Sequence, residues 1–128
     1  MDKGIKFSIE RKVTNDMTAR NMGSGTLDVF ATPAMIALIE ETAWRSVAPE
    51  IEDGMATVGT NLNIAHVAPT PVGMTVRCET ELAEIDGRRL VFNVKVSDEC
   101  GEIGKGTHER FIINEEKFQK KADGKKQF

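Results

Sequence analysis

The sequence predicts an α+β fold in which an antiparallel sheet of about five strands wraps around one central helix. Residues 29–48 form an apolar segment with helical periodicity, bounded by helix start and stop signals. After residue 54 the apolar residues recur every second position, as they do in strands, with turn residues between the runs. Because 128 residues are the length of one domain, these elements must share a single core. We therefore expect one domain over residues 1–128.

The chain opens with residues 5–13, whose first half alternates between apolar and polar side chains and predicts a strand. Residues 14–26 follow as a polar segment that contains Gly23 and Gly25. This length suits either a flap over a site or a plain surface loop, and we favour the loop.

The central helix is the best-defined element of the sequence. Thr32 is a good N-cap, Pro33 is favoured in the first turn, and Pro49 ends the helix. Glu41 and Arg45 are four residues apart and are expected to pair on a solvated face. The opposite, buried face is predicted from the helical spacing to carry Ile36, Ala37, Glu40, Ala43, Trp44 and Val47.

Four strands are expected after the helix. The first, near residues 58–66, is predicted to turn Val58, Thr60, Leu62, Ile64 and His66 toward the core. Asp86-Gly87 is a strong hairpin signal between the next two strands. Their inward residues are predicted to be Val76, Cys78, Thr80 and Leu82, and then Leu90, Phe92, Val94 and Val96. The last strand is expected over residues 103–114, after a turn at residues 99–102.

The chain end, from about residue 117, is basic. We expect a solvated, frayed tail there, with attraction to phosphate groups as the alternative. Its lysines are Lys117, Lys120, Lys121, Lys125 and Lys126.

Composition excludes several classes of protein. A net charge of −3 gives no general case for nucleic-acid binding. We find neither a membrane-spanning apolar run nor the apolar core of a signal peptide, so a cytoplasmic protein is expected. Cys78 and Cys100 are expected to be free thiols, and together with His66 and His108 they show no zinc-binding spacing. No metal or cofactor is therefore predicted.

Few polar residues are expected to point into the core. Glu40 faces inward from the helix, His66 from the neighbouring strand, and Thr32 stands at the helix N-terminus, which favours developing negative charge. An acid, an imidazole and a hydroxyl in such a place can support acyl transfer or hydrolysis. Each also has a structural explanation: Thr32 as a cap, and Glu40 and His66 as a core pair.

The spacing of Thr32 and Glu40 restricts how they act together. Eight helical residues separate side chains by about 12 Å along the helix axis, too far for a hydrogen bond. Three arrangements stay open. His66 bridges the two residues, Thr32 lies in a bent segment before the true helix, or the site combines residues from two subunits.

Several separated motifs resemble those of the fluoroacetyl-CoA thioesterase-like branch of the hot-dog superfamily, over about residues 13–118. The motifs, in order, are Val29-Phe30-Ala31-Thr32-Pro33, Leu38-Ile39-Glu40, Val58-Gly59-Thr60, His66 with Ala68-Pro69-Thr70-Pro71-Val72-Gly73, Asp86-Gly87-Arg88-Arg89-Leu90, and Ile103-Gly104-Lys105-Gly106-Thr107-His108-Glu109-Arg110.

The resemblance implies a hot-dog fold and a homodimer whose two sheets join edge to edge, with two acyl-CoA sites near the interface. It implies that Thr32, Glu40 and His66 are catalytic and that Gly59 and Arg110 line the acyl pocket. From chemistry alone, Gly59 permits close approach of a ligand, and Arg110 is equally explained as an ion-paired surface residue. Residues 22–26 offer no aromatic cluster to enclose a fluorinated acyl group, so fluoroacetyl specificity is not expected.

We therefore expect a thioesterase that hydrolyses a short or small acyl-CoA, with His66 as general base and with no nucleic-acid or membrane partner. One alternative is a non-catalytic module that binds acyl-CoA or another small ligand. A hot-dog hydratase or dehydratase is a further alternative, although the strand carries no Asp closely preceding the His.

Overall fold

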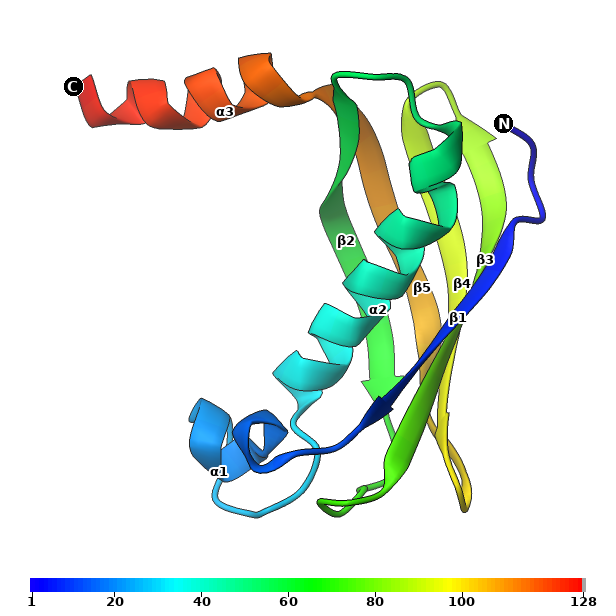
Figure 1. Ribbon diagram of the computed structural model, residues 1–128, viewed down its shortest axis with the longest axis vertical. Coiled ribbons are helices and arrows are strands. Elements are labelled where there is room, and N and C mark those ends of the chain that lie inside the picture. The colour runs from blue at the N-terminus through cyan, green and yellow to red at the C-terminus, as the bar shows by residue number, and fades with distance from the viewer. Residues whose placement is uncertain (128) are drawn as a thin grey trace.

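A curved antiparallel sheet of five strands packs against one long helix in the computed structural model, which describes residues 1–127 (Figure 1). The spatial order is β1-β3-β4-β5-β2, so β1 and β2 form the two edges. This arrangement confirms the predicted fold class. The strands are β1 (Lys6–Lys12), β2 (Met55–His66), β3 (Thr75–Asp86), β4 (Arg89–Asp98) and β5 (Gly101–Asn114).

Helix α2 (Thr32–Val47) supplies one side of the core and the sheet supplies the other. The residues predicted to face inward from β3 and β4 are all buried. The helix itself is rotated from the prediction, because Trp44 is 45% exposed and Ala37 is also exposed. Apolar residues surround the first turns of α2, so the sequence left its inward face ambiguous. The buried helix residues are Met35, Leu38, Ile39, Thr42, Ala43, Ser46 and Val47.

The start of α2 also differs from the prediction. Ala31 is the N-cap and makes no side-chain capping bond, while Thr32 is the first helical residue. The predicted capping role of Thr32 is therefore wrong, and its exposed hydroxyl remains available for another partner.

A β-bulge in β2 reverses the expected alternation of its first half. Gly59 pairs with Arg110 and Asn61 pairs with Glu109, which leaves Thr60 as an extra residue. A Cβ on Gly59 would point at the Glu40 carboxylate, so Gly59 faces α2 and its neighbour Val58 faces away. The prediction that Val58 and Thr60 point inward is thus wrong.

Beyond the bulge, the predicted phase of β2 is correct. Leu62, Ile64 and His66 are half-buried and alternate with exposed residues. The bulge therefore absorbs Thr60, so that both halves of the strand present side chains to the helix.

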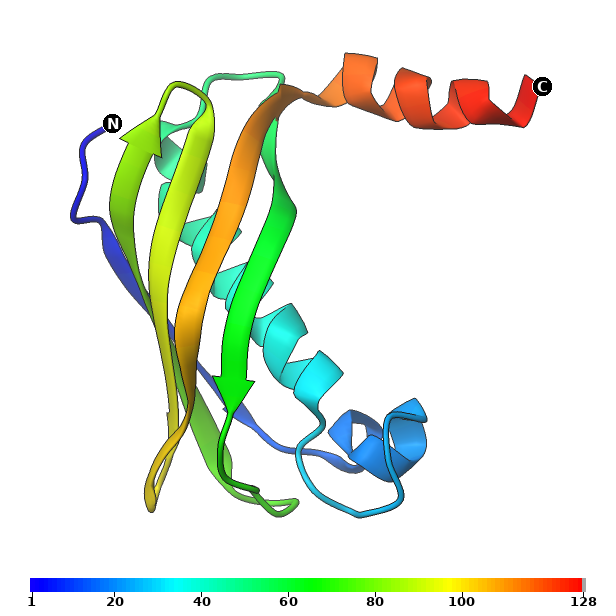
Figure 2. The same ribbon diagram turned by 180° about the vertical axis from the view of Figure 1, so that it is seen from behind.

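Short helices replace two segments expected to be irregular. The segment before α2 contains η1 (Asn15–Met17) and α1 (Ala19–Met22), whose N-cap is Thr18. The chain end forms α3 (Glu115–Asp123) and η3 (Gly124–Gln127) instead of a frayed tail. Asn114 caps α3, which has acidic residues in its first turn and lysines in its last. Figure 2 shows α3 projecting away from the sheet beside β2.

The turns follow the sequence signals closely. Asp86 pairs with Arg89 across a two-residue turn in which Gly87 has a φ of 61°. The last strand begins two residues before the predicted start, at Gly101, because Glu99 and Cys100 alone form the preceding turn. Both cysteines are free, as predicted. Among the described residues, no helix has the length and apolar character needed to cross a membrane.

Gly106 is expected to be the glycine least tolerant of substitution. Its φ is 154°, and a Cβ there would lie 1.9 Å from the backbone oxygen of Asn63 on β2. Gly106→Ala should therefore lower the free energy of unfolding by several kcal/mol, measured by urea denaturation. Gly124→Ala is the matched control, because its added Cβ meets no atom within 4 Å. Equal stability of the two variants would contradict this packing.

Candidate active site

Two groups of polar side chains lie along α2, on the side of the sheet that faces the helix. The first, the start cluster, consists of Thr32 and His66 at the beginning of α2. The second, the arginine cluster, consists of Glu40, Thr57, His108 and Arg110 beside the middle of α2. The β2–β5 pair supplies three of the four residues of the arginine cluster.

In the start cluster, Thr32 Oγ1 lies 2.7 Å from His66 Nδ1. Burial lowers the pKa of His66, and the nearby backbone of Ala68 opposes this effect only in part. Nε2 is buried and makes no hydrogen bond of ordinary geometry within the described chain. His66 is therefore neutral near pH 7, and its Nδ1 can accept the hydroxyl proton of Thr32.

A cleft of about 280 Å³ opens beside this pair. The segment that leads into α2 forms one wall, and the residues that follow β2 form the other. The pair thus faces a space large enough for a small acyl group. The lining residues are Ala19, Ser24, Val29, Phe30, Ala31, Thr32, His66, Val67, Ala68 and Pro69.

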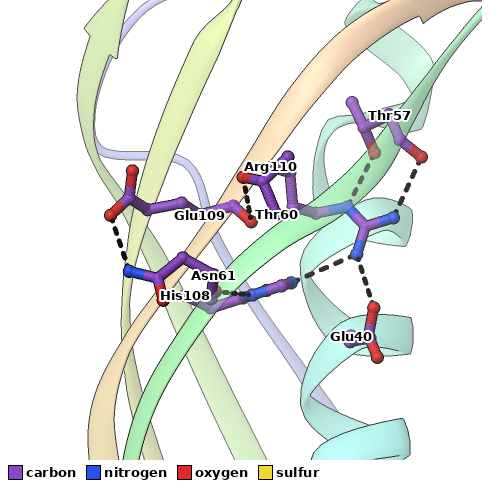
Figure 3. A network of polar contacts seen from close by, with 7 residues as sticks. All are labelled: Glu40, Thr57, Thr60, Asn61, His108, Glu109 and Arg110. Carbon is purple, nitrogen blue, oxygen red and sulfur yellow. Dashed lines mark hydrogen bonds and ion pairs between the residues drawn. The ribbon is translucent and has the colours of Figure 1, made fainter.

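The arginine cluster is organised by the guanidinium of Arg110, which is 5% exposed (Figure 3). Its Nε donates to Thr57 Oγ1 at 2.8 Å, and Nη2 donates to the Thr57 carbonyl oxygen at 2.9 Å. Nη1 lies 3.1 Å from His108 Nε2 and 3.4 Å from Glu40 Oε2. Burial lowers the pKa of Arg110, and Glu40 counteracts this by stabilising the charge.

The hydrogen-bond partners of His108 determine which of its ring nitrogens carries a hydrogen. Nδ1 lies 2.9 Å from the Asn61 carbonyl oxygen, which can only accept, so Nδ1 carries a hydrogen. Nε2 faces Arg110, which can only donate, so Nε2 carries none. The fully buried ring is therefore neutral, and burial lowers its pKa.

Gly59 lies where β2 approaches Glu40. A Cβ at this position would lie 2.5 Å from Glu40 Oε2 and 3.3 Å from Arg110 Nη1. No side chain fits there unless the carboxylate moves. The sequence predicted a glycine for close approach of a ligand, whereas the group that approaches Gly59 in this structure is the Glu40 carboxylate of the same chain.

The predicted site residues fall into these two groups. Thr32 and His66 are in contact, whereas no hydrogen bond between described residues joins Glu40 to either of them. Glu40 is half-buried, with its side chain 38% exposed, and is not the fully buried acid expected. Arg110 is ion-paired as one interpretation proposed, but it is buried.

Two of the three arrangements considered for Thr32 and Glu40 can be judged from this geometry. Thr32 belongs to the regular helix, so the bent-segment arrangement is wrong. His66 contacts Thr32 but makes no hydrogen bond to Glu40, so it does not bridge these two residues within the described chain.

Sequence reasoning missed two members of the arginine cluster, Thr57 and His108. The available signal for His108 was its position two residues before Arg110 on the same strand, which puts both side chains on one face of the sheet. Thr57 carried no such signal, because the bulge changed which residues of β2 face the helix.

The model of the fluoroacetyl-CoA-specific thioesterase family matches residues 13–116. The chain belongs to this family. A fluoroacetyl-CoA thioesterase from Streptantibioticus cattleyicolor is 44% identical over 95 residues, which are 74% of this chain and 68% of that protein. The solved fluoroacetyl-CoA thioesterase FlK is 37% identical, with a TM-score of 0.94 over 98% of this chain and 97% of that one.

A thioesterase superfamily member from Thermus thermophilus has the same fold, with 27% identity and a TM-score of 0.90 over 98% of this chain and 93% of that one. Membership of the family confirms the predicted hot-dog fold and the predicted thioesterase activity on acyl-CoA.

The two histidines are expected to be neutral in opposite tautomers. The contacts give His108 a hydrogen on Nδ1, whereas a hydrogen bond donated by the Thr32 hydroxyl to Nδ1 of His66 leaves the ring hydrogen of His66 on Nε2. ¹⁵N NMR of histidine-labelled protein at pH 7.5 should show one ring of each kind, since the chain has only two histidines. Thr32→Val should perturb the His66 signals and leave those of His108 in place. Two rings of the same tautomer would contradict this assignment.

Proposed function

We propose that this thioesterase hydrolyses a small acyl-CoA in the cleft beside Thr32 and His66. The observation that carries the proposal is the 2.7 Å contact between the hydroxyl and a neutral imidazole at the edge of that cleft. The FlK structures include complexes with fluoroacetate and CoA and with acetyl-CoA, which are ligands of that protein. The small cleft supports a small acyl group here, but residues 22–26 offer no aromatic cluster to select a fluorinated one.

In the proposed reaction, His66 acts as general base. It takes a proton either from Thr32, which then attacks the thioester carbonyl, or from a water molecule that attacks directly. The carbonyl oxygen becomes an oxyanion, the C–S bond then breaks, and protonated His66 gives its proton to the departing CoA thiolate. If water attacks, this step yields the free acid directly. If Thr32 attacks, the acyl group stays on Thr32 as an ester, which a water activated by His66 then hydrolyses to the free acid and the free hydroxyl. Each route consumes one water, and its steps use the groups of this chain, the thioester and water.

The first turn of α2 is a suitable place for the oxyanion. No side chain caps this end of the helix, so backbone N–H groups of the first turn remain free to donate. The helix dipole adds a partial positive charge at the same place.

We assign Glu40 to the same reaction through a second copy of the chain. Strand β2 is an open edge of 12 residues that contains no Lys, Arg, Asp, Glu or Pro. Such an edge readily pairs with another strand, whereas the opposite edge, β1, is charged. Antiparallel pairing of two β2 strands about a two-fold axis would place both α2 helices on the same face.

The exposed face of α2 supports this assembly. Ala37 and Trp44 are exposed, and Ile36 is half-buried midway between Thr32 and Glu40. A two-fold axis passing near Ile36 would bring Thr32 of one copy level with Glu40 of the other. A site built across the interface in this way removes the 12 Å separation that one helix imposes.

The cellular location and the type of activity are inferred together with this mechanism. We infer a cytoplasmic enzyme, for which CoA esters are the available substrates. A non-catalytic binding module or a hydratase is disfavoured by the family's thioesterase activity.

Removal of the base or of the hydroxyl should reduce turnover. His66→Ala should lower kcat by about 10² to 10⁴, measured as CoA thiol release from a panel of short, branched and aryl acyl-CoA esters. Thr32→Val should also lose activity, while Thr32→Ser, which keeps the hydroxyl, serves as the matched control. Undiminished turnover by His66→Ala would exclude His66 as the base.

Mixing two inactive variants tests the shared site. In a mixed dimer of Thr32→Val and Glu40→Gln copies, one of the two composite sites contains both native residues. Random exchange of subunits should therefore restore about a quarter of wild-type activity. Failure to regain activity, with subunit exchange verified by native mass spectrometry, would place Thr32 and Glu40 of one copy in the same site.

A further inference from the structure

His108 is a fully buried polar side chain beside Arg110, and the proposed reaction gives it no role. It is 0% exposed and packs against the ring of Phe92, with the two ring centroids 6.2 Å apart. Both ring nitrogens nevertheless have fixed partners, on β2 and on β5. A buried imidazole that satisfies two specific groups fixes their relative positions.

The contacts of Arg110 explain what His108 holds in place. Thr57 binds Nε and Nη2 on one side of the guanidinium. On the other side, Nη1 has two hydrogens, one directed to His108 and the other to Glu40 (Figure 3). The bond to His108 is the shorter, and it joins two buried groups, whereas the Glu40 side chain is 38% exposed. His108 therefore fixes the end of Arg110 that meets the carboxylate.

We propose that neutral His108 is a positioning residue that holds Arg110 against Glu40 and thereby sets the orientation of the Glu40 carboxylate in the active site. This inference rests on the proposed role of Glu40 in hydrolysis. His108 does not reach the cleft beside Thr32, whose lining excludes it. It acts through Arg110 alone.

Protonation of His108 would reverse this arrangement. An Nε2–H group cannot accept from Arg110, and the imidazolium would place a second positive charge beside the buried guanidinium. Nη1 of Arg110 would then lose the acceptor that fixes it beside Glu40, and activity would fall on the acid side. The charged groups that face or flank His108 are Arg110 and Glu109 on β5 and Glu40 on α2, while its neighbours on β2 and β4, Asn61, Leu62 and Phe92, do not titrate.

Two substitutions separate the two bonds of His108. His108→Gln has an amide oxygen near the position of Nε2 and can still accept from Arg110. His108→Asn has an amide N–H near the position of Nδ1 and can still donate to the Asn61 carbonyl, but it leaves Arg110 without an acceptor. Both variants replace the imidazole ring with an uncharged amide. A difference between them therefore reports which of the two hydrogen bonds is kept and not the loss of the ring.

The proposal predicts unequal effects. His108→Asn should lower kcat by about 10 to 100-fold with little change in KM, while His108→Gln should retain most of the turnover. In the wild type, the fall of kcat/KM at acid pH should reflect two protonations, at His66 and at His108. In His108→Gln it should reflect one, at His66. Equal losses in both variants, or an unchanged acid limb in His108→Gln, would overturn the proposal.

NMR of the Arg110 Nε–H group gives a readout that does not need turnover. Its signal should shift with pH in step with the His108 ring and should lose this dependence in His108→Gln. This distinguishes two failures. If the wild type hydrolyses no ester of the panel, the proposed function fails, while a coupled shift still supports the hold of His108 on Arg110. Independent titration of the two groups would overturn that hold.

Discussion

A buried positive charge imposes the strictest requirement on this structure. The Arg110 guanidinium lies almost wholly out of water, where an unpaired charge is very costly. Its neighbours meet that requirement from three elements: a hydroxyl and a carbonyl from β2, an imidazole from β5 and a carboxylate from α2. The packing of β2 and β5 against α2 is therefore constrained by the need to place hydrogen-bond acceptors around the Arg110 guanidinium.

Helix α2 connects the arginine cluster, which lies beside its middle, with the start cluster at its first residue. The helix is regular from Thr32 to Val47, so the hydroxyl of the start cluster and the carboxylate of the arginine cluster keep a fixed separation. One copy therefore holds the proposed nucleophile and base at one level of the helix and the Glu40 carboxylate at another. The uncharged edge of β2 and the exposed side of α2 lie together, and a second copy placed there would bring the two levels into register.

Periodicity and turn residues were sufficient to predict the fold. Asp86-Gly87 located the hairpin, and the inward residues of β3 and β4 were correct, because long regular strands make alternation reliable. The phase of α2 failed because apolar residues surround its first turns. The first half of β2 failed because nothing in the local sequence marks Thr60 as an extra residue.

The site was predictable to the extent that it depends on phase. The inward phase of His66 was predicted correctly, whereas Thr32 was expected to be the N-cap and is the first helical residue. The arginine cluster was not predicted, because the acceptors around Arg110 depend on contacts between β2, β5 and α2 that only the folded chain brings together. His108 shows the limit well: Arg110 lies two residues along the same strand, but Asn61 is 47 residues away and meets the ring only through the β2–β5 pairing.

The bulge at Thr60 has a further consequence for how this strand can change in evolution. Substitution of Thr60 disturbs one hydroxyl contact to the Glu109 backbone on the exposed side of the sheet. Loss of Thr60 would keep the register, because Gly59 and Asn61 already pair with the consecutive residues Arg110 and Glu109, so the inward residues of both halves would keep their faces. Insertion of one residue between Asn61 and His66 would be a different event, since every later side chain would turn to the opposite face and the imidazole of His66 would leave Thr32. The bulge therefore makes β2 tolerant of change at Thr60 and intolerant of an added residue beyond it.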